Sequence, residues 1–323
     1  MLERKYSEMR STERQMTRRQ YLTLMAGTAV AALAPMKLRG ENGRSVLRLA
    51  VSAETLAGAN VNDARAAYKV WLREVRGQLG YDNAEAVPDI FIPSEDLIRS
   101  VRQGALDCYG VTALEFAKLV DLTDSDSLVI QDYLADGMEY LILVHSRSRF
   151  NQIADLKGAQ VLSHLHRDMV LLPTWLRTML AAHNLPAPEN LFASLKFNNN
   201  LNQVLLPVFF HRADAACLAR RSWETAVELN PQLGRDVRAL AVSPKVIPIV
   251  FGFRRGTTAN ARKSLIESIQ HVTTIPGGRE IVAMYQSSDV VVKPVSVMKG
   301  TLEIVRQFER LSGQQAVTRR GPV

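Results

Sequence analysis

Strand-like and helix-like hydrophobic patterns alternate along most of this sequence. Short runs rich in apolar and β-branched residues are typical of strands, and we expect strands at 45–52, 89–93, 106–112, 138–145, 157–163, 193–197, 213–219 and 246–253. Between them, apolar residues recur every three or four positions, as on one face of a helix. These helical segments are 64–79, 94–104, 113–120, 169–185, 202–211, 222–231, 258–272, 277–286 and 297–311. The alternation predicts an α/β fold with right-handed crossovers.

Two of the expected strands, near residues 140 and 250, are unbroken apolar runs that predict crossings between two lobes. One lobe then comprises 45–143 plus 251–323, and the other comprises 144–250. Two crossings form a two-strand hinge, and a cleft between hinged lobes is a common place for a ligand.

The N-terminal segment has the pattern of an export signal. Arg18 and Arg19 precede the apolar run 21–34, which is too short to span a bilayer comfortably and resembles the apolar region of a signal peptide. The stretch 17–22, "TRRQYL", also resembles the twin-arginine export signature. We therefore predict a signal peptide at 1–34, with cleavage after Ala31 or Ala34. The alternative is an amphipathic N-terminal helix of a cytosolic protein.

Composition and charge narrow the function classes. The chain has 323 residues, 47% hydrophobic and 22% charged, which is typical of a globular protein. Its formal charge is +8, and without the first 34 residues it has 34 Lys and Arg against 29 Asp and Glu, or +5. A mildly basic chain suits an anionic ligand. There is no block of Lys and Arg and no zinc-finger spacing, so we expect no nucleic-acid partner.

The two cysteines, Cys108 and Cys217, each lie in a strand-like apolar run. Two such residues are expected to be buried free thiols, although an oxidising compartment would also permit a disulfide.

The stretch "SHLHRD" contains the strongest candidate chemistry. His164 and His166 have i, i+2 spacing, which puts both imidazoles on one side of a strand, as in some metal sites. A metal needs a third and usually a fourth ligand, and only four other histidines are present, so we expect no metal and no cofactor. His166, Arg167 and Asp168 imitate a kinase catalytic loop, but Pro173 stands where that loop needs Asn.

Further catalytic motifs are missing from the sequence. There is no Walker motif, no GxSxG and no HExxH, although catalytic groups could still converge in space. Our prediction that the protein is not an enzyme follows from the family resemblance described next. Asp168 can alternatively be the cap or a first-turn acid of the following helix.

Several stretches in order resemble the substrate-binding proteins of ABC transporters, in the branch that binds phosphate, phosphite and phosphonates. They are "LAVSAETLAGANVNDARAAYKVWLREVRGQLG", "LIRSVRQGALDCYGVTALEFA", "YLILVHSRSRFNQIADLKGAQV", "RADAACLARRSWETAVELNP", "VSPKVIPIVFGFRRG" and "LIESIQHVTTIPGGREIVAMYQSSDVV". Together they cover nearly all of 46–292. The resemblance implies a two-lobed type 2 periplasmic binding protein fold, each lobe a mixed sheet flanked by helices. It further implies a periplasmic monomer that delivers a small anionic solute to an ABC permease in the inner membrane.

In this fold, the carboxyl ends of strands and the following helix starts face the cleft and can present free N–H groups to an anion. On that basis the expected ligand-binding residues are Ser52, Glu54, Ser94, Tyr109, Thr112, His164, His166, Arg167, Asn198, Arg220 and Trp223. Alternatives stay open for several: Ser94 as a helix cap, Tyr109 as core and Asn198 as part of a turn.

The resemblance also implies that the turn at 163–168 should be rich in Ser, Thr and Gly, whereas this chain has His164, His166 and Arg167 there. The ligand is then held by guanidinium and imidazole groups, or its specificity lies elsewhere. Two other classes also stay open: a ligand-sensing module for a membrane receptor, and an exported enzyme on the same fold.

Overall fold

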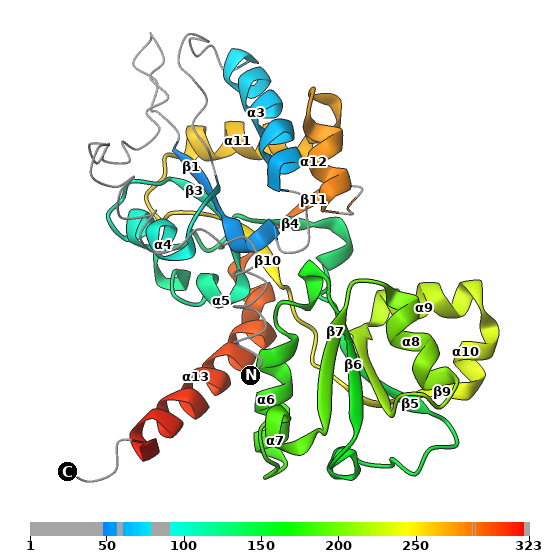
Figure 1. Ribbon diagram of the computed structural model, residues 1–323. Helices are drawn as coiled ribbons and strands as arrows, with labels where there is room; N and C mark the ends of the chain where they lie inside the picture. The colour runs from blue at the N-terminus through cyan, green and yellow to red at the C-terminus, as the bar shows by residue number, and fades with distance from the viewer. Residues whose placement is uncertain (1–47, 57–60, 79–90, 286, 288, 320–323) are drawn as a thin grey trace, which may run out of the picture. The chain divides into compact units, whose positions relative to one another are not determined.

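The computed structural model describes residues 48–56, 61–78, 91–285, 287 and 289–319 (Figure 1). The chain divides into two compact units, 1–35 and 36–323, and all the described residues belong to the second. The predicted signal peptide at 1–34 lies outside the described residues. None of the helices that the structure describes is both long and apolar enough to cross a membrane.

Lobe 1 comprises a six-stranded sheet and the helices that cover it. Its strand order is β11-β4-β10-β3-β1-β2. The strands are β1 (Leu49–Ser52), β2 (Phe91–Ile92), β3 (Cys108–Thr112), β4 (Leu128–Gln131), β10 (Ile249–Phe253) and β11 (Val290–Lys293). β1 pairs in parallel with β2 and β3, whereas β10 is antiparallel to both β3 and β4. The carboxyl ends of β1 to β4 therefore lie along one edge of the sheet.

Lobe 2 is a five-stranded sheet with its own helices. Its strand order is β7-β6-β8-β5-β9. The strands are β5 (Tyr140–His145), β6 (Gln160–His164), β7 (Ser194–Asn198), β8 (Ala215–Ala219) and β9 (Val237–Val242). β6 is parallel to β7 and β8, while β5 is antiparallel to β8 and β9. This register places the start of β5 at the same edge as the ends of β6, β7 and β8.

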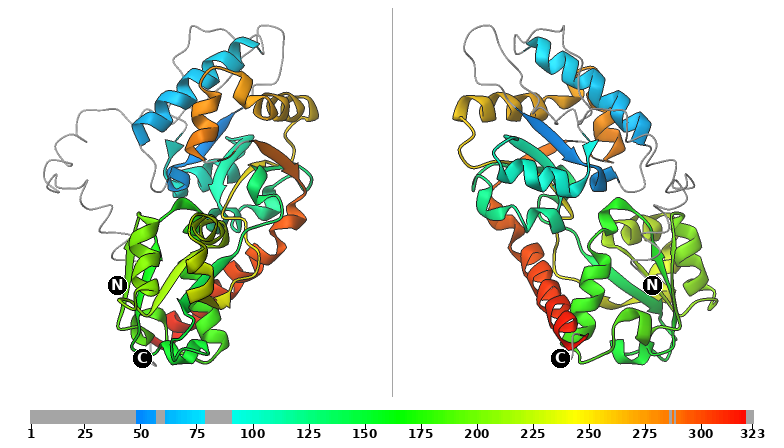
Figure 2. Two further views of the ribbon diagram at one scale, coloured as in Figure 1. Left: turned by 90° about the vertical axis from the view of Figure 1, so that its right-hand side faces the viewer. Right: turned by 60° about the vertical axis from the view of Figure 1, so that its left-hand side comes forward.

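Alternating side chains of the central strands divide lobe 1 into two packed layers. Leu49 and Val51 point to one face, with α3 (Val61–Gln78), α11 (Ala259–Gln270) and α12 (Gly278–Met284), and Ala50 points to the other, with α4 (Ser94–Arg102) and α5 (Ala113–Phe116). Figures 1 and 2 show α3 and α12 side by side. The long helix α13 (Lys299–Arg319) packs against α5 and against α6 (Leu172–Ala182) of lobe 2.

Lobe 2 has the same layering. Ile142 and Val144 of β5 face the layer of α6 (Leu172–Ala182) and α7 (Pro188–Leu191), and Leu141 and Leu143 face the opposite layer. That second layer consists of α8 (Leu201–Phe209), α9 (Arg220–Leu229) and α10 (Pro231–Asp236). Short 3₁₀ turns connect the elements: η1 (Ala53–Leu56), η2 (Val120–Leu122), η3 (Asp132–Leu134), η4 (Ile153–Leu156), η5 (Arg167–Met169), η6 (Val272–Thr274) and η7 (Val295–Met298).

The chain crosses between the sheets twice, at 132–139 and at 243–248. In these segments the Met138 N–H donates to the Val246 carbonyl at 2.9 Å, and the Val246 N–H donates back at 2.8 Å. All of β5 belongs to the sheet of lobe 2, and all of β10 belongs to lobe 1. The crossings thus come before Tyr140 and Ile249, not after 143 and 250, because apolar runs identify strands but not the sheet that each strand joins.

Three local features extend or correct the sequence predictions. β4 and β11 were not expected, and they pair antiparallel with each other. The helix expected to end at Pro231 does end there, since α9 ends at Leu229, and Pro231 also begins the short helix α10, capped by the Asn230 side chain, which accepts a hydrogen bond from Gln232 N–H. Cys108 and Cys217 are buried and free, as predicted, and burial raises the pKa of both thiols, to about 12 for Cys217.

A glycine at the start of α12 provides a test of this packing. A Cβ at Gly278 would lie 1.7 Å from the Val272 carbonyl oxygen, so either α12 or η6 would have to move. We expect Gly278→Ala to lower the free energy of unfolding by about 3 kcal/mol in urea denaturation. The control is Gly158→Ala, where the open surroundings leave only the left-handed φ of 75°, a cost of about 1 kcal/mol. Equal losses in the two variants would contradict the close packing at Gly278.

Candidate functional site

The turn after β6 lies at the carboxyl edge of lobe 2. β6 ends at His164, and the N–H of Asp168 donates to Nδ1 of His166 at 3.3 Å, which caps the short turn η5. The imidazole rings of His164 and His166 stack with 5.6 Å between centroids and 13° between planes. Nδ1 of His164 is buried and has no hydrogen-bond partner. The two histidines predicted here are therefore adjacent at this edge.

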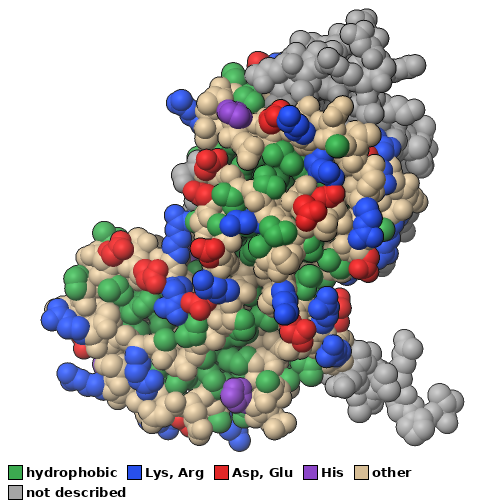
Figure 3. Space-filling model, turned by 180° about the vertical axis from the view of Figure 1, so that it is seen from behind, with side chains coloured by type: hydrophobic (Ala, Val, Ile, Leu, Met, Phe, Trp, Pro, Cys, Tyr) green, Lys and Arg blue, Asp and Glu red, His purple; other side chains and the backbone are tan. Residues whose placement is uncertain are grey.

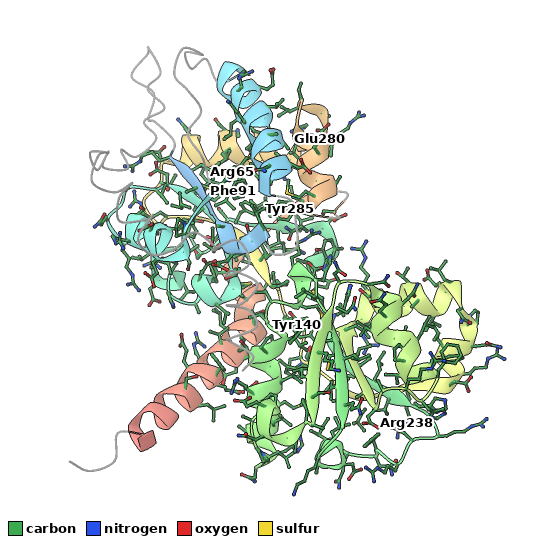
Figure 4. All side chains as sticks on the ribbon, in the orientation of Figure 1. Arg65, Phe91, Tyr140, Arg238, Glu280 and Tyr285 are labelled. Carbon is green, nitrogen blue, oxygen red and sulfur yellow. The ribbon has the colours of Figure 1, made fainter. Side chains whose placement is uncertain are left out.

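Arg167 is the most buried charged group of the turn. Only 7% of the residue is exposed, and its Nη1 donates to the main-chain carbonyl of Met284, at the end of α12 in lobe 1. The guanidinium carbon lies 5.5 Å from the ring centroid of Tyr285, a cation–π contact. Nη2 is buried and lacks a partner, although a buried guanidinium normally satisfies all its donors. Figure 4 labels Tyr285 beside α12.

Asp168 supplies the negative charge that faces this arginine. Its Oδ1 lies 3.8 Å from Nε of Arg167 and accepts the Tyr133 hydroxyl at 3.1 Å. The Tyr140 hydroxyl donates to the main-chain carbonyl of Asp168 at 2.6 Å. Across the turn, the guanidinium carbon of Arg221 lies 4.6 Å from the Tyr133 ring centroid. The turn is thus fixed by aromatic side chains that sequence reasoning did not select.

Burial governs the protonation of the surrounding groups. Burial, and then the neighbouring His166, lowers the pKa of His164, while the Asn199 carbonyl and Asp168 act in the opposite direction. Burial also raises the pKa of the Tyr133 and Tyr285 hydroxyls, and Arg167 opposes both increases. His164 and the two phenols are accordingly held in their neutral forms, which leaves Arg167 as the buried cation of the turn.

The corresponding edge of lobe 1 is arranged differently, around Glu115. This carboxylate is only 4% exposed and accepts the Ser52 hydroxyl, the Thr112 hydroxyl at 2.8 Å and the Thr112 N–H at 2.7 Å. Ser52 and Thr112 end the adjacent strands β1 and β3, as predicted, but their donors point to Glu115. The spacing Thr112-x-x-Glu115 is a capping-box signature, so the sequence did contain a signal for this carboxylate.

Two more predicted residues of lobe 1 differ from expectation. Ser94 does not cap α4, because the capping position is Pro93 and the structure shows no side-chain cap hydrogen bond there. Tyr109 does not end its strand but lies at the amino end of β3, fully buried, with its hydroxyl 2.6 Å from Oγ1 of Thr123. Its placement matches the core alternative. Glu54 is half-buried in η1, and its N–H donates to Oγ of Ser52 at 3.2 Å.

The remaining predicted residues of lobe 2 follow β7 and β8. Nδ2 of Asn198 donates to Gln203 at 2.6 Å and its Oδ1 accepts from the N–H of Asn200, so Asn198 builds the turn into α8. Arg220, at the start of α9, pairs with Glu139. Trp223 packs against the core layer of α8 and β8.

Five of the predicted site residues therefore lie in two groups. The structure gathers His164, His166 and Arg167 around Asp168, and gathers Ser52 and Thr112 around Glu115. Among the described residues, no group of three or more His, Cys, Asp or Glu could hold a metal ion. On the face in Figure 3, basic and acidic side chains are interspersed, without the continuous basic surface that nucleic-acid binding uses.

A family model and two solved structures are similar to this chain. Residues 57–293 match the family model described as "ABC transporter, phosphonate, periplasmic substrate-binding protein". The fold is similar to that of PhnD1 from Prochlorococcus marinus (MIT 9301) in complex with methylphosphonate, at 15% identity and a TM-score of 0.50, covering 81% of this chain and 97% of that one. It is also similar to XAC2383 from Xanthomonas citri bound to chloride ion, at 14% identity and a TM-score of 0.53, covering 82% and 99%. The comparison with curated protein sequences finds no match.

The Glu115 cluster gives a stability prediction. We expect Glu115→Ala to lower the free energy of unfolding by about 3 kcal/mol, because it leaves three buried donors of Ser52 and Thr112 without an acceptor. Ser52→Ala removes one donor and leaves two for the carboxylate, so it should cost about 1 kcal/mol. Urea denaturation of both variants measures the difference, and a Glu115→Ala loss no larger than that of Ser52→Ala would contradict the cluster.

Proposed function

The chain belongs to the phosphonate-binding family of periplasmic ABC-transporter substrate-binding proteins, and from this premise we propose that it captures a small anion through Arg167. The family consists of substrate-binding transport proteins and not of enzymes, which confirms the sequence prediction on that point. Membership also implies a small-molecule ligand, a membrane permease as partner and a periplasmic location.

The observation that carries the proposal is the unpaired Nη2 of Arg167. A guanidinium that is only 7% exposed has lost most of its hydration, and the donor without a partner adds to that cost. A phosphate, phosphonate or carboxylate oxygen would supply the missing acceptor in a charge-assisted hydrogen bond. The unpaired Nδ1 of the neighbouring His164 offers a second polar contact.

Lobe 1 supports the same assignment by contrast. Ser52 and Thr112 give their hydroxyl and N–H donors to Glu115, and that carboxylate would repel an anion at the ends of β1 and β3. We therefore assign the anionic part of the ligand to the turn 164–168 of lobe 2, and a neutral or donor-bearing part to the side of Glu115. A small phosphonate with one ionised oxygen facing Arg167 fits this division of charge.

The test is a thermal-shift screen with phosphate, methylphosphonate, sulfate and acetate. An anion present at 100 times its Kd should stabilise the protein by about 2.7 kcal/mol. For the best anion, Arg167→Ala should weaken binding by about 2 kcal/mol or more, a roughly 30-fold increase in Kd. Arg167→Lys keeps the charge without the planar fork and should give an intermediate loss.

The matched control is Arg177→Ala, which removes an arginine of α6 that pairs with Glu189 in α7. It should leave Kd unchanged. Full affinity in Arg167→Ala would reject the role of this residue. If none of the four anions stabilises the wild-type protein, the anionic assignment fails while the family membership stands.

We also propose that residues 1–34 direct export through the twin-arginine signature. Replacing Arg18 and Arg19 together by Lys should leave an unprocessed precursor in the cytoplasm, whereas Arg10→Lys should be exported normally. Fractionation and N-terminal sequencing measure this outcome, and the mature protein should begin at residue 32 or 35. Normal export of the double variant would refute the proposal.

A further inference from the structure

Lobe 1 contains a partly enclosed cavity. It lies between the sheet and the layer of α3, α11 and α12, and its volume is about 60 Å³. The sheet contributes alternate residues of β1 and β4 to its wall, so one face of the sheet forms its floor. The wall is almost entirely apolar and includes Val51, Val129 and Val282.

Two buried polar atoms belong to residues of this wall and lack partners. They are Nε1 of Trp71, which can only donate, and Oε1 of Gln131, which can only accept. Trp71 is 3% exposed and Gln131 is 4% exposed, so water outside the protein does not satisfy either atom. A buried donor and a buried acceptor without partners each cost free energy, which a ligand that paired with them would recover.

The other polar groups of the wall already have partners. The Tyr68 and Tyr285 hydroxyls are 3.2 Å apart, and the Ser287 hydroxyl donates to Oδ1 of Asp132 at 2.7 Å. A buried water usually makes about three hydrogen bonds, and empty cavities with apolar walls stay dry. Water alone is thus a poor filling for most of this space, whereas a mainly apolar molecule with one hydroxyl matches both the wall and the two unpaired atoms.

We propose that this cavity binds a small, uncharged, mainly apolar molecule that carries one hydroxyl group. The hydroxyl would accept from Trp71 and donate to Gln131, and the hydrocarbon part would contact the valines of the wall. Since one water needs about 10–15 Å³ of such volume, the cavity has room for roughly four to six non-hydrogen atoms. The cavity shares Tyr285 with the surroundings of Arg167, but the proposal does not rest on the proposed function.

1-Butanol is a suitable probe, with n-butylammonium and butyrate as charged molecules of similar length. Saturation-transfer NMR on the full chain should detect bound 1-butanol and neither charged analogue. Val282→Phe fills the cavity and should raise the Kd of 1-butanol at least tenfold. Val242→Phe makes the same exchange at a 43% exposed position of β9 in lobe 2 and should leave Kd unchanged.

Gln131→Leu provides a second test that does not depend on the filled variant folding. It removes an acceptor that has no partner in the free protein, so the fold should tolerate it, and Kd should rise about tenfold. Absence of saturation transfer in the wild type, or an unchanged Kd in folded Val282→Phe, would overturn the site. An unchanged Kd in Gln131→Leu would overturn the polar pairing on which the hydroxyl assignment rests.

Discussion

Burying the charge of Arg167 constrains the structure around it. A guanidinium removed from water needs acceptors and a counter-charge: this one donates to the Met284 carbonyl, 117 residues later, and has the Asp168 carboxylate 3.8 Å from its Nε. The carbonyl is in place only because α12 ends there, and α12 begins at Gly278, where a side chain would collide with η6. The position of one charged group thus depends on the packing of both lobes.

The two sheets treat charge at their strand ends in opposite ways. In lobe 1, Glu115 accepts the donors that end β1 and β3, and the group is complete within the protein. In lobe 2, Arg167 and His164 each retain a buried nitrogen without a partner. A buried polar group without a partner costs stability, and a ligand that supplies the missing partner recovers that cost. This contrast supports placing the anion at the turn of lobe 2.

Much of this arrangement could be predicted from the sequence, because it depends on local patterns. The alternation of strands and helices predicted the α/β class, and both the family model and the two sheets confirm the binding-protein fold. The predicted ends of two strands, β6 and β3, also placed His164, Arg167 and Thr112 correctly at the edges of the sheets. Strands β4 and β11 were missed because they are defined by pairing with each other across the sequence.

The residues that surround Arg167 were harder to predict, because they too are brought together by contacts between segments far apart in the sequence. Glu115 had a local signature, since Thr112 and Glu115 form a capping box. Tyr133, Met284 and Tyr285 had none, because nothing in their neighbouring residues indicates that they will meet Arg167. Tyr109 was counted among the residues at the carboxyl end of its strand although it lies near the amino end, and Ser94 was assigned a capping role that its hydroxyl does not perform.

The ring of Tyr285 has one face toward the guanidinium of Arg167. Tyr285 also forms part of the wall of the cavity in lobe 1. A displacement of this ring would change the surroundings of Arg167 and the wall of the cavity together. The two proposed ligands would then be thermodynamically linked through it. Such linkage is reciprocal. If a molecule in the cavity changes the Kd of the anion by some factor, the anion changes the Kd of that molecule by the same factor. A single aromatic side chain would then give a transport protein a means of adjusting its affinity for one solute to the concentration of another.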